Sequence, residues 1–485
     1  MLRIDSLSRH ALYAVEATRR IETLAQSTLP PHSLMQRAGS AVARLALALA
    51  PHSRRIWIAC GAGNNGGDGL EAALHLQRSG KSVLVTWLGS PGTAPPDASA
   101  SHQRALAGGV RIAQSAPDDC DLCIDALLGI GAARAPQGQM ADWIRLMNAA
   151  SAMVLAVDVP TGLQADTGAV AEPHIRAHHT LSLLTLKPGL FTAHGRDASG
   201  TVWFDDLALA TSVFSQQQAI TPAAWLAGEP APAQRLHASH KGSYGDIAII
   251  GGATGMTGAA LLAGSAALHA GAGRVFIALL DNDAMKVDIV QPELMFRPID
   301  SLDFKPMTVV CGCGGGDAIR GALARILSTS ARLVIDADAL NRIAVDSQFQ
   351  TLLRARGRRG SATVLTPHPL EAARLLDCAV LDVQGDRIAA AQLMAKRFDC
   401  TVVLKGSGSV VAAPDQTPVI NSTGNARLAS AGTGDVLSGM IGARLAAGMA
   451  PFEAAWQAVY HHGLLADRWP PVAPALTAAR LAQSQ

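Results

Sequence analysis

Asp435 follows a glycine-rich segment and opens a predicted helix, a position in which a carboxylate can do chemistry. Glycines stand before it at positions 424, 432 and 434. The first turn of a helix has unpaired backbone N–H groups and a partial positive charge, so this segment can bind a phosphate. A carboxylate repels phosphate, and its presence therefore indicates a general base acting on a nearby hydroxyl group. Capping of the helix is the alternative role for Asp435, but it leaves the glycines unexplained.

Other polar segments of the second half follow predicted apolar strands. In a parallel sheet, ligands bind beyond the carboxyl ends of the strands. We therefore expect these segments to converge on one cleft with Asp435; they are residues 311–316, 336–341, 366–369 and 405–409.

The first half carries its own glycine-rich segment, residues 61–69, between a predicted strand at 56–60 and a predicted helix at 70–78. A strand, a glycine-rich turn and a helix form the first half of a nucleotide-binding βα unit. The spacing differs from the usual dinucleotide fingerprint. The amides of Asn64 and Asn65 can bind both a ribose and a cation.

Two aspartates, Asp125 and Asp158, stand at the ends of later strands in the same half. Asp125 precedes a glycine-containing loop with a cation at Arg134. Asp158 precedes the rigid turn 159–162, which we expect to expose the hydroxyl of Thr161. Capping or pinning of its own loop is the alternative role for each aspartate taken alone.

Predicted strands alternate with predicted helices along both halves of the chain. This alternation predicts an α/β fold with parallel, doubly wound sheets. The composition agrees, because 49% of the residues are hydrophobic and only 16% are charged. A length of 485 residues suits two domains. The polar run at 215–218, with prolines soon after, predicts a linker and a boundary near Ala219.

Composition also argues against several classes of partner. The net charge of +2 offers no basic stripe for nucleic acid, and no apolar run suits a signal peptide or a membrane span. We expect a cytoplasmic protein whose seven cysteines are reduced. The pairs Cys120 with Cys123 and Cys311 with Cys313 have metal-ligand spacing, but Cys123 belongs to an apolar strand and the pairs fall in different halves.

The second half resembles the ADP-dependent NAD(P)H-hydrate dehydratases, whose fold is ribokinase-like. The resemblance rests on these runs: H-K-G-S-Y-G at 240–245, D-A-D-A-L-N at 336–341, L-T-P-H-P at 365–369, V-L-K-G at 403–406, and T-G-N with A-G-T-G-D-V-L-S-G within 423–439. The segment C-G-C-G-G-G at 311–316 departs from the family's usual I-G-P-G-L-G, and the loss of its proline predicts a more mobile loop.

The first half resembles the NAD(P)H-hydrate epimerases, which have a Rossmann-like fold. The resemblance rests on G-N-N-G-G-D-G at 63–69, D-A-L-L-G-I-G at 125–131 and D-V-P-T-G at 158–162. Together the two resemblances imply two three-layer αβα domains, an epimerase at 1–218 and a dehydratase at 225–485. They also imply a bifunctional repair enzyme, which we expect to be a homo-oligomer.

The implied substrate is NAD(P)H that has gained water across its ring, in an R or an S configuration. The dehydratase would consume the S form with ADP, giving AMP, phosphate and NAD(P)H, and the epimerase would interconvert the two forms. Asp435 would be the general base of the first reaction and Asp158 the acid or base of the second. We expect Mg²⁺ with ADP, and a potassium ion held by Asn65, Asp125 and Thr161.

The resemblance also implies binding roles for two sets of residues. Those expected to bind the dinucleotide in the first half are Asn64, Asn65, Gly66, Gly67, Asp68, Gly129, Ile130, Gly131, Ala132, Ala133, Arg134 and Ala135. In the second half, adenosine and phosphate would contact Lys405, Gly406, Ser407, Gly408, Ser409 and Gly434, and the hydrate would contact Ala259, Gly316 and His368.

An ATP-dependent ribokinase-like kinase of vitamins or sugars is the alternative function, because such kinases use the same G-T-G-D acid. The first half would then be a nucleotide-binding scaffold without catalysis. For His368, a structural role is as good an expectation as a ligand contact.

Overall fold

The computed structural model describes residues 1–131, 134–209, 220–232, 237–281 and 283–485. The described chain forms two compact units, Met1–Leu226 and Ala227–Gln485. The linker expected at 215–218 and the boundary expected near Ala219 lie outside the described residues.

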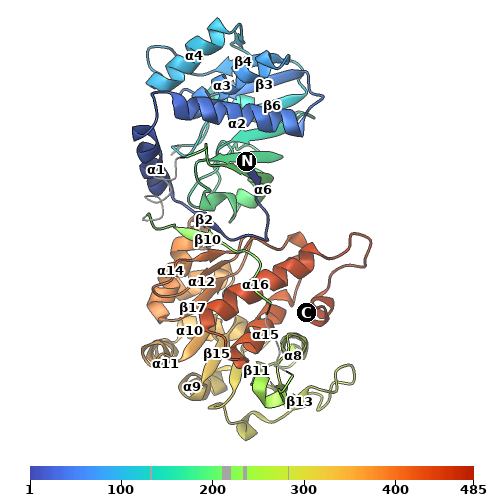
Figure 1. The fold of residues 1–485 in the computed structure, drawn as a ribbon. Coiled ribbons are helices and arrows are strands. Elements are labelled where there is room, and N and C mark those ends of the chain that lie inside the picture. The colour runs from blue at the N-terminus through green and yellow to red at the C-terminus, as the bar shows by residue number, and fades with distance from the viewer. Residues whose placement is uncertain (132–133, 210–219, 233–236, 282) are drawn as a thin grey trace. The chain divides into compact units, whose positions relative to one another are not determined.

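Unit 1 is built on one sheet (Figure 1) whose neighbouring strands are parallel, apart from the antiparallel pair of β1 and β9. Across the sheet the strands are β1 (Leu2–Arg3), β9 (Thr201–Asp205), β8 (His179–Leu183), β7 (Met153–Val157), β6 (Leu122–Ala126), β3 (Arg55–Cys60), β4 (Ser82–Trp87) and β5 (Arg111–Ala113). The short strands β2 (His10–Leu12) and β10 (Ala224–Leu226) pair with each other. Both β1 and β2 come before α1 in the opening segment of the chain.

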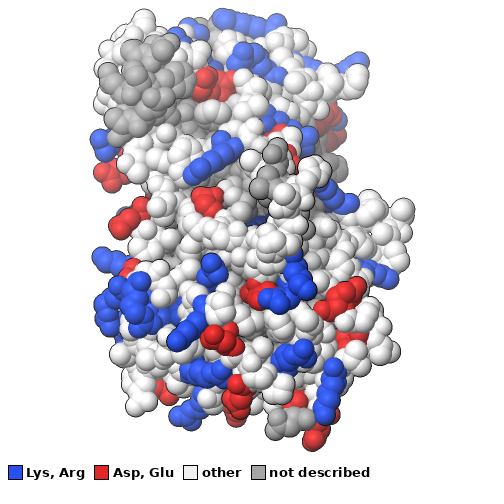
Figure 2. Space-filling model, turned by 60° about the horizontal axis from the view of Figure 1, so that its bottom comes forward, with Lys and Arg blue, Asp and Glu red and all other residues white. Residues whose placement is uncertain are grey.

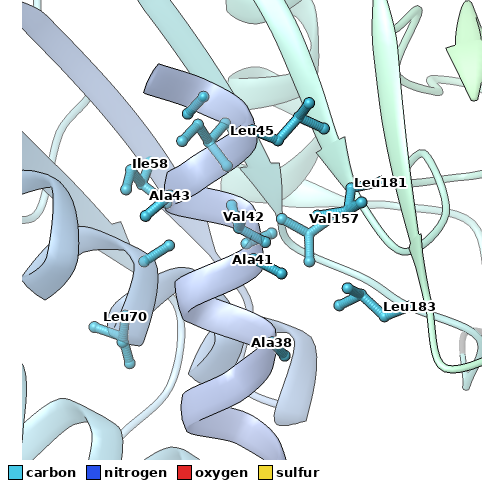
Figure 3. Packing of buried hydrophobic residues seen from close by; sticks show 14 of the residues in the cluster. Ala38, Ala41, Val42, Ala43, Leu45, Ile58, Leu70, Val157, Leu181 and Leu183 are labelled. Atoms are coloured by element: carbon cyan, nitrogen blue, oxygen red, sulfur yellow. The ribbon is translucent and has the colours of Figure 1, made fainter. Parts of the chain in front are cut away.

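Alternation along β3 places apolar side chains on both faces of this sheet. Ile56 and Ile58 join a core with α2 (Ser33–Leu49), whereas Trp57 joins a second core with Trp143 of α5 (Gly138–Ala149). Figure 3 shows Val42 and Leu45 of α2 in the first of these cores. That core also includes residues of α1 (Val15–Ser27), α3 (Asn64–Arg78) and α4 (Pro96–Ala107). Helices thus cover both faces, as the αβα prediction required. Unit 1 also contains η1 (Pro188–Leu190) and α6 (Gly195–Ser199).

Unit 2 has a second parallel sheet that ends in an antiparallel ribbon. Its strands run in the order β13 (Met295–Phe296), β12 (Arg274–Leu279), β11 (Asp246–Gly251), β14 (Thr308–Cys311), β15 (Arg332–Ile335), β16 (Ala362–Leu365), β17 (Thr401–Leu404), β18 (Val410–Ala412) and β19 (Val419–Ile420).

Two groups of helices cover this sheet (Figure 1). One group is α8 (Thr257–His269), α15 (Thr433–Ala446), α16 (Pro451–Asp467) and α17 (Ala478–Gln483); the other is α9 (Arg320–Thr329), α10 (Ala337–Val345), α11 (Ser347–Arg358), α12 (Pro369–Leu376), α13 (Val380–Gly385) and α14 (Arg387–Phe398). Short 3₁₀ turns complete the unit as η2 (Lys241–Tyr244), η3 (Ile299–Ser301) and η4 (Ala426–Leu428). Small residues bring α8 and α15 together, because a Cβ at Gly439 would lie 2.1 Å from the carbonyl oxygen of Ala263.

On the face shown in Figure 2, basic and acidic side chains are interspersed. Among the described residues, every helix is too short or too polar to cross a membrane.

Candidate active sites

The order of strands in unit 1 reverses at β3, which lies between β4 and β6. Ligands of doubly wound folds bind at such a switch point, beyond the carboxyl ends of the strands. A cavity of about 410 Å³ lies there, and its lining includes Glu22, Asn64, Asn65, Asp68, Asp158 and Lys187. The structure therefore brings together part of the set of first-half residues that the sequence singled out.

The glycine-rich segment at 61–69 was predicted to be a turn, but only its first three residues precede the helix, because α3 begins at Asn64. A Cβ at Gly66 would lie 2.0 Å from the carbonyl oxygen of Gly61, and one at Gly67 would lie 2.5 Å from the sulfur of Met35. These glycines therefore let the first turn of the helix pack against β3 and α2. The first-turn residues Asn64 and Asn65 line the cavity.

Asp158 is held in the cavity wall by a lysine that sequence reasoning missed. Its backbone is left-handed, with φ of 66°. Its carboxylate forms an ion pair with the buried Lys187 and accepts a hydrogen bond from the N–H of Leu183 at 3.1 Å. Lys187 also donates to the carbonyl oxygen of Leu183 at 2.7 Å. A lysine soon after the apolar strand β8 was the available signal.

Two further carboxyl groups face the same cavity. Burial and then the charge of Asp158 raise the pKa of Glu22, and the same two causes raise the pKa of Asp68 well above its usual value. Both groups therefore hold a proton more tightly than an ordinary carboxyl group does. Sequence reasoning assigned no role to Glu22.

Asp125 and Thr161 meet as expected, but the hydroxyl of Thr161 is buried rather than exposed. It donates to Asp125 at 2.6 Å and accepts from the N–H of Leu128 at 3.0 Å. The expectation of an exposed hydroxyl was wrong because the turn folds inward onto this carboxylate. Burial raises the pKa of Asp125 to about 6, against the opposing effect of its hydrogen bonds.

Asn65 supplies an amide to the wall of the same cavity, and its side-chain nitrogen is buried without a hydrogen-bond partner among the described residues. Gly129, Ile130 and Gly131 also line the cavity. Arg134 and Ala135 are exposed, and Ala132 and Ala133 lie outside the described residues.

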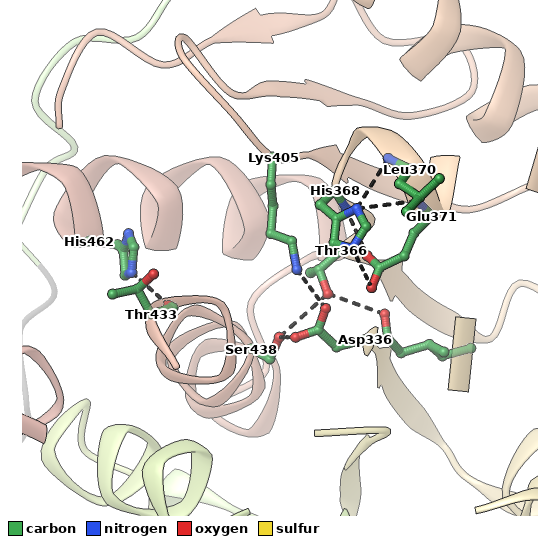
Figure 4. A network of polar contacts seen from close by, with 10 residues as sticks. Asp336, Thr366, His368, Leu370, Glu371, Lys405, Thr433, Ser438 and His462 are labelled. Atoms are coloured by element: carbon green, nitrogen blue, oxygen red, sulfur yellow. Dashed lines mark hydrogen bonds and ion pairs between the residues drawn. The ribbon is translucent and has the colours of Figure 1, made fainter. Parts of the chain in front are cut away.

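In unit 2, polar residues meet at the carboxyl ends of β15, β16 and β17 (Figure 4). Lys405 donates to one oxygen of Asp336 at 2.7 Å, and Ser438 of α15 donates to the other at 2.7 Å. Both oxygens of this buried carboxylate are thus satisfied. Burial would lower the pKa of Lys405, but Asp336 and Glu371 outweigh it and raise the pKa.

Asp435 lies in the first turn of α15 and is only partly exposed. Burial and then the charge of Asp336 raise its pKa to about 7, while Cys313 and Lys405 oppose the rise. One side-chain atom each of Cys313, Asp336 and Asp435 lies within 4.8 Å of the other two. A carboxyl group whose pKa is near neutral suits general-base work.

Glycines shape the start of α15, as the sequence predicted. Gly432 caps the helix with φ of 88°. A Cβ at Gly434 would lie 3.3 Å from the ammonium nitrogen of Lys405, so this glycine lets the cation approach the helix start. The ring of His462, whose pKa burial lowers to about 4, lies 2.9 Å from the carbonyl oxygen of Thr433 and is hydrogen-bonded to it.

His368 caps α12 by accepting from the N–H groups of Leu370 and Glu371 at 3.1 and 3.2 Å. Its other ring nitrogen lies 3.2 Å from the carboxylate of Glu371, whose pKa burial raises to about 7. The structural role is therefore present, and the half-exposed ring still borders the network of Figure 4.

The remaining second-half candidates lie in the first turn of α8 and in the segments that follow β14 and β17. A Cβ at Gly314 would lie 2.9 Å from the Cβ of Ala259, which places Ala259 beside the loop that contains Gly316. The turn 406–409 is closed by a 3.2 Å bond from the N–H of Gly406 to the hydroxyl of Ser409. Ser407 and Gly408 lie within the same turn.

Arg387 was also missed by sequence reasoning. It is buried beneath the 406–409 turn and donates to the carbonyl oxygen of Lys405 at 3.1 Å. Its helical setting in α14 gave no signal of this distant contact.

Comparisons with known proteins agree with this division. Residues 247–484 match the family described as NAD(P)H-hydrate dehydratase, and residues 31–189 match the family described as YjeF-related protein N-terminus. The bifunctional NAD(P)H-hydrate repair enzyme Nnr of Escherichia coli is 36% identical, over 94% of this chain and 89% of that protein. The enzyme of the same name from Coxiella burnetii is 33% identical, over 94% of each chain.

Two further matches concern the second half. The ADP-dependent (S)-NAD(P)H-hydrate dehydratase of Neisseria meningitidis is 45% identical, over 48% of this chain and 80% of that protein. A crystal structure of the ADP/ATP-dependent NAD(P)H-hydrate dehydratase of Bacillus subtilis, co-crystallized with ATP and Mg²⁺, is 30% identical. It covers 52% of this chain and 91% of that chain, with a TM-score of 0.44. Given the identity and coverage of the full-length relatives, the chain belongs to the family of bifunctional NAD(P)H-hydrate repair enzymes.

Proposed function

We propose that this chain repairs hydrated nicotinamide nucleotides with two separate sites. Unit 2 dehydrates the S form of NAD(P)H hydrate with ADP, giving NAD(P)H, AMP and phosphate, and unit 1 interconverts the R and S forms. The observation that carries the first activity is a carboxyl group with a near-neutral pKa, Asp435, at the start of a glycine-capped helix. The names of the full-length relatives support both activities.

The dehydration begins at the hydroxyl group of the hydrate. Asp435 takes the proton of this hydroxyl while its oxygen bonds to the terminal phosphorus of ADP and AMP leaves. Backbone N–H groups around Gly432 and Gly434 stabilise the charge on the transferring phosphoryl group. The ring nitrogen's lone pair then expels phosphate, and loss of the neighbouring ring proton restores the dihydronicotinamide.

Lys405 supplies the fixed positive charge of this site. Its ion pair with Asp336 points the ammonium group toward the start of α15, where a phosphate would bind. Since both oxygens of Asp336 already accept hydrogen bonds, we assign Mg²⁺ to the oxygens of the diphosphate rather than to a protein cage. Mg²⁺ would neutralise charge on the phosphates.

The ligand contacts of unit 2 are proposed from their place around the network. Lys405 and the turn 406–409 would bind the adenosine and phosphate of ADP. Ala259, in the first turn of α8, and Gly316, on the loop beside it, would line the hydrate side together with His368.

In unit 1 we propose Asp158 as the acid or base that moves a proton during inversion. Its ion pair with Lys187 fixes the carboxylate at the wall of the cavity. The dinucleotide would bind along residues 64–68 and 129–135, over the first turn of α3.

The residues expected to hold potassium offer oxygen ligands to a hard cation. Asp125 is a buried carboxylate whose pKa burial raises, and Asn65, which carries an amide oxygen, lines the cavity. An oxygen-coordinated cation at Asn65, Asp125 and Thr161 would keep the carboxylate charged and add positive charge near the ligand.

The test is product analysis with chemically hydrated NADH as substrate. With the S form and ADP, we expect reduced-nicotinamide absorbance to return as AMP and phosphate appear in equal amounts. With the R form alone, we expect the S form to appear without nucleotide. A phosphorylated vitamin or sugar formed from ATP, with hydrate untouched, would favour the kinase with a scaffold domain instead. A cytoplasmic location and a homo-oligomeric state stay predictions.

A further inference from the structure

Arg387 is a buried cation beneath the turn 406–409, and the proposed reaction gives it no part. It belongs to α14, and the residue is only 1% exposed. One terminal guanidinium nitrogen donates to the carbonyl oxygens of Leu404 and Lys405, at 3.1 Å each. The other donates to the side-chain oxygen of Gln384 at 2.6 Å. These hydrogen bonds fix the plane of the guanidinium group against the end of β17.

The guanidinium group also lies close to the first residue of the turn. A Cβ at Gly406 would lie 2.8 Å from one of its nitrogens, and the backbone there has a positive φ of 143°. A side chain at this position would therefore clash with Arg387 and strain the backbone. The glycine lets the buried cation lie directly against the turn.

A series of hydrogen bonds continues from Arg387 into the turn. The peptide group between Lys405 and Gly406 accepts from Arg387 through its carbonyl oxygen, and its N–H donates to the hydroxyl of Ser409 at 3.2 Å. That hydroxyl donates to the carbonyl oxygen of Gly406 at 3.1 Å. Hydrogen bonds linked in this way polarise one another, and a charged donor strengthens them. Burial lowers the pKa of Arg387 to about 10, so the guanidinium group keeps its charge at neutral pH.

The contacts of Lys405 show what depends on this hold. Its N–H donates to the carbonyl oxygen of Pro367 at 2.9 Å, and its carbonyl oxygen accepts from Arg387. Its side chain donates to Asp336 at 2.7 Å. Arg387 therefore fixes the backbone of the residue that supplies the positive charge of the proposed phosphate site.

We propose that Arg387 is a positioning residue for the nucleotide of the dehydratase, because it holds the backbone of Lys405 and Gly406 so that the turn 406–409 keeps the shape that receives ADP. The proposal rests on the proposed function, in which Lys405 and this turn bind the adenosine and phosphate of ADP. Without the contacts to the two carbonyl groups the turn would sample other shapes. Binding of ADP would then cost free energy to order the turn, and the affinity would fall.

Arg356 offers a matched control in the same unit. It is also 1% exposed, and burial lowers its pKa to about 10 as well. It donates to the carbonyl oxygens of Leu327 and Ser330, at 3.2 and 2.7 Å, and to the hydroxyl of Thr363 at 3.0 Å. These acceptors lie at the end of α9 and at the start of β16, on the opposite edge of the parallel strands from the turn 406–409. Loss of this arginine should therefore disturb the fold without changing the turn.

The experiment measures the Kd for ADP with Mg²⁺ by calorimetry, and then KM and kcat with the S hydrate, for full-length wild type, Arg387→Met, Arg387→Lys and Arg356→Met. We expect Arg387→Met to raise the Kd and the KM for ADP about tenfold, with a much smaller fall in kcat at saturating ADP. Arg387→Lys keeps the charge but not the planar fork, so it should recover only part of the affinity. Arg356→Met should lose stability and still bind ADP like wild type. An unchanged Kd in Arg387→Met, or an equal rise in Arg356→Met, would overturn the proposal.

A milder variant covers the case in which the Arg387 variants do not fold. Gln384 is only partly buried, and Gln384→Ala removes an acceptor of the guanidinium group while leaving the arginine in place. We expect its Kd for ADP to rise about threefold. If the Arg387 variants are unfolded, this variant decides, and a Kd equal to that of wild type contradicts the proposed role.

Binding and turnover together separate this inference from the proposed function. A protein whose Kd for ADP depends on Arg387, but which leaves the S hydrate untouched, would argue against the dehydratase and keep the positioning role. An active dehydratase in which Arg387→Met binds ADP like wild type would keep the function and remove the role.

Discussion

At the scale of single residues, the second site works through opposing effects on one carboxyl group. Burial and Asp336 favour the protonated form of Asp435, whereas Cys313 and Lys405 favour the charged form. The result is a pKa of about 7, well above that of an ordinary aspartate. A general base needs such a value, because it must accept a proton from a hydroxyl and release it again near neutral pH.

This arrangement predicts a cost in stability at neutral pH. An aspartate whose pKa is higher in the folded protein stabilises it at low pH, and that contribution disappears as pH rises from about 4 to about 7. Asp435→Asn removes this dependence. We expect the variant to be more stable than wild type at about pH 8, by on the order of 1–3 kcal/mol, and to lose about 10²-fold or more of kcat.

Thermal unfolding without nucleotide, followed from acidic to alkaline pH, measures the difference. Glu371, whose pKa is also raised to about 7, remains in the variant, so a reduced pH dependence should persist. A variant less stable than wild type in alkaline buffer contradicts the assignment.

At the scale of elements, α3 shows why glycines were misread as a turn. Glycine disfavours helices by about 1 kcal/mol relative to alanine, so the sequence predicted a helix only from residue 70. In the structure the helix begins at Asn64. The glycines at 66 and 67 allow this because a side chain at either position would clash with neighbouring atoms. Close packing in three dimensions outweighs a local preference.

The same helix supports a prediction about stability. Gly66→Ala places a Cβ 2.0 Å from the carbonyl oxygen of Gly61. Relief of this clash requires the backbone of α3 or of Gly61 to shift, which costs free energy. We expect a loss of about 1–3 kcal/mol in the free energy of unfolding of unit 1. Gly63→Ala is the matched control, since a Cβ there meets nothing within 4 Å. Denaturant unfolding compares the two, and equal losses would show that the glycines are not needed for packing.

Much of the fold was readable from the sequence. Apolar runs gave strands such as β3, β6 and β14, and glycines with aspartates at strand ends gave the sites. Some contacts between distant side chains could not be predicted. The ion pair of Asp158 with Lys187 and the hydrogen bond from Arg387 to the carbonyl oxygen of Lys405 depend on how strands and helices are ordered in space, which local periodicity does not contain.

At the scale of the whole molecule, each unit has its own sheet and its own point where strand order reverses, at β3 and at β11. Each set of proposed catalytic groups lies within one unit. Asp158 and Lys187 belong to the first, and Asp336, Lys405 and Asp435 belong to the second. The two activities should therefore be separable by mutation.

The corresponding prediction uses a mixture of two inactive proteins. With R hydrate and ADP, Asp158→Ala and Asp435→Asn should each fail to regenerate NADH above the rate without enzyme. Mixed together, they should restore it, because the first keeps the dehydratase and the second keeps the epimerase. Recovery of absorbance measures the outcome, and a mixture as inactive as its parts would show that the roles are assigned wrongly or that the hydrate is not released between sites.

The close packing of the first turn of α3 also has a consequence for nucleotide binding. Gly66 packs against the backbone of Gly61, and Gly67 packs against the side chain of Met35. This packing holds the backbone N–H groups of the first turn of α3 in position before a ligand binds. Binding then costs little free energy for ordering the chain, so we expect a preorganised nucleotide site at the start of α3.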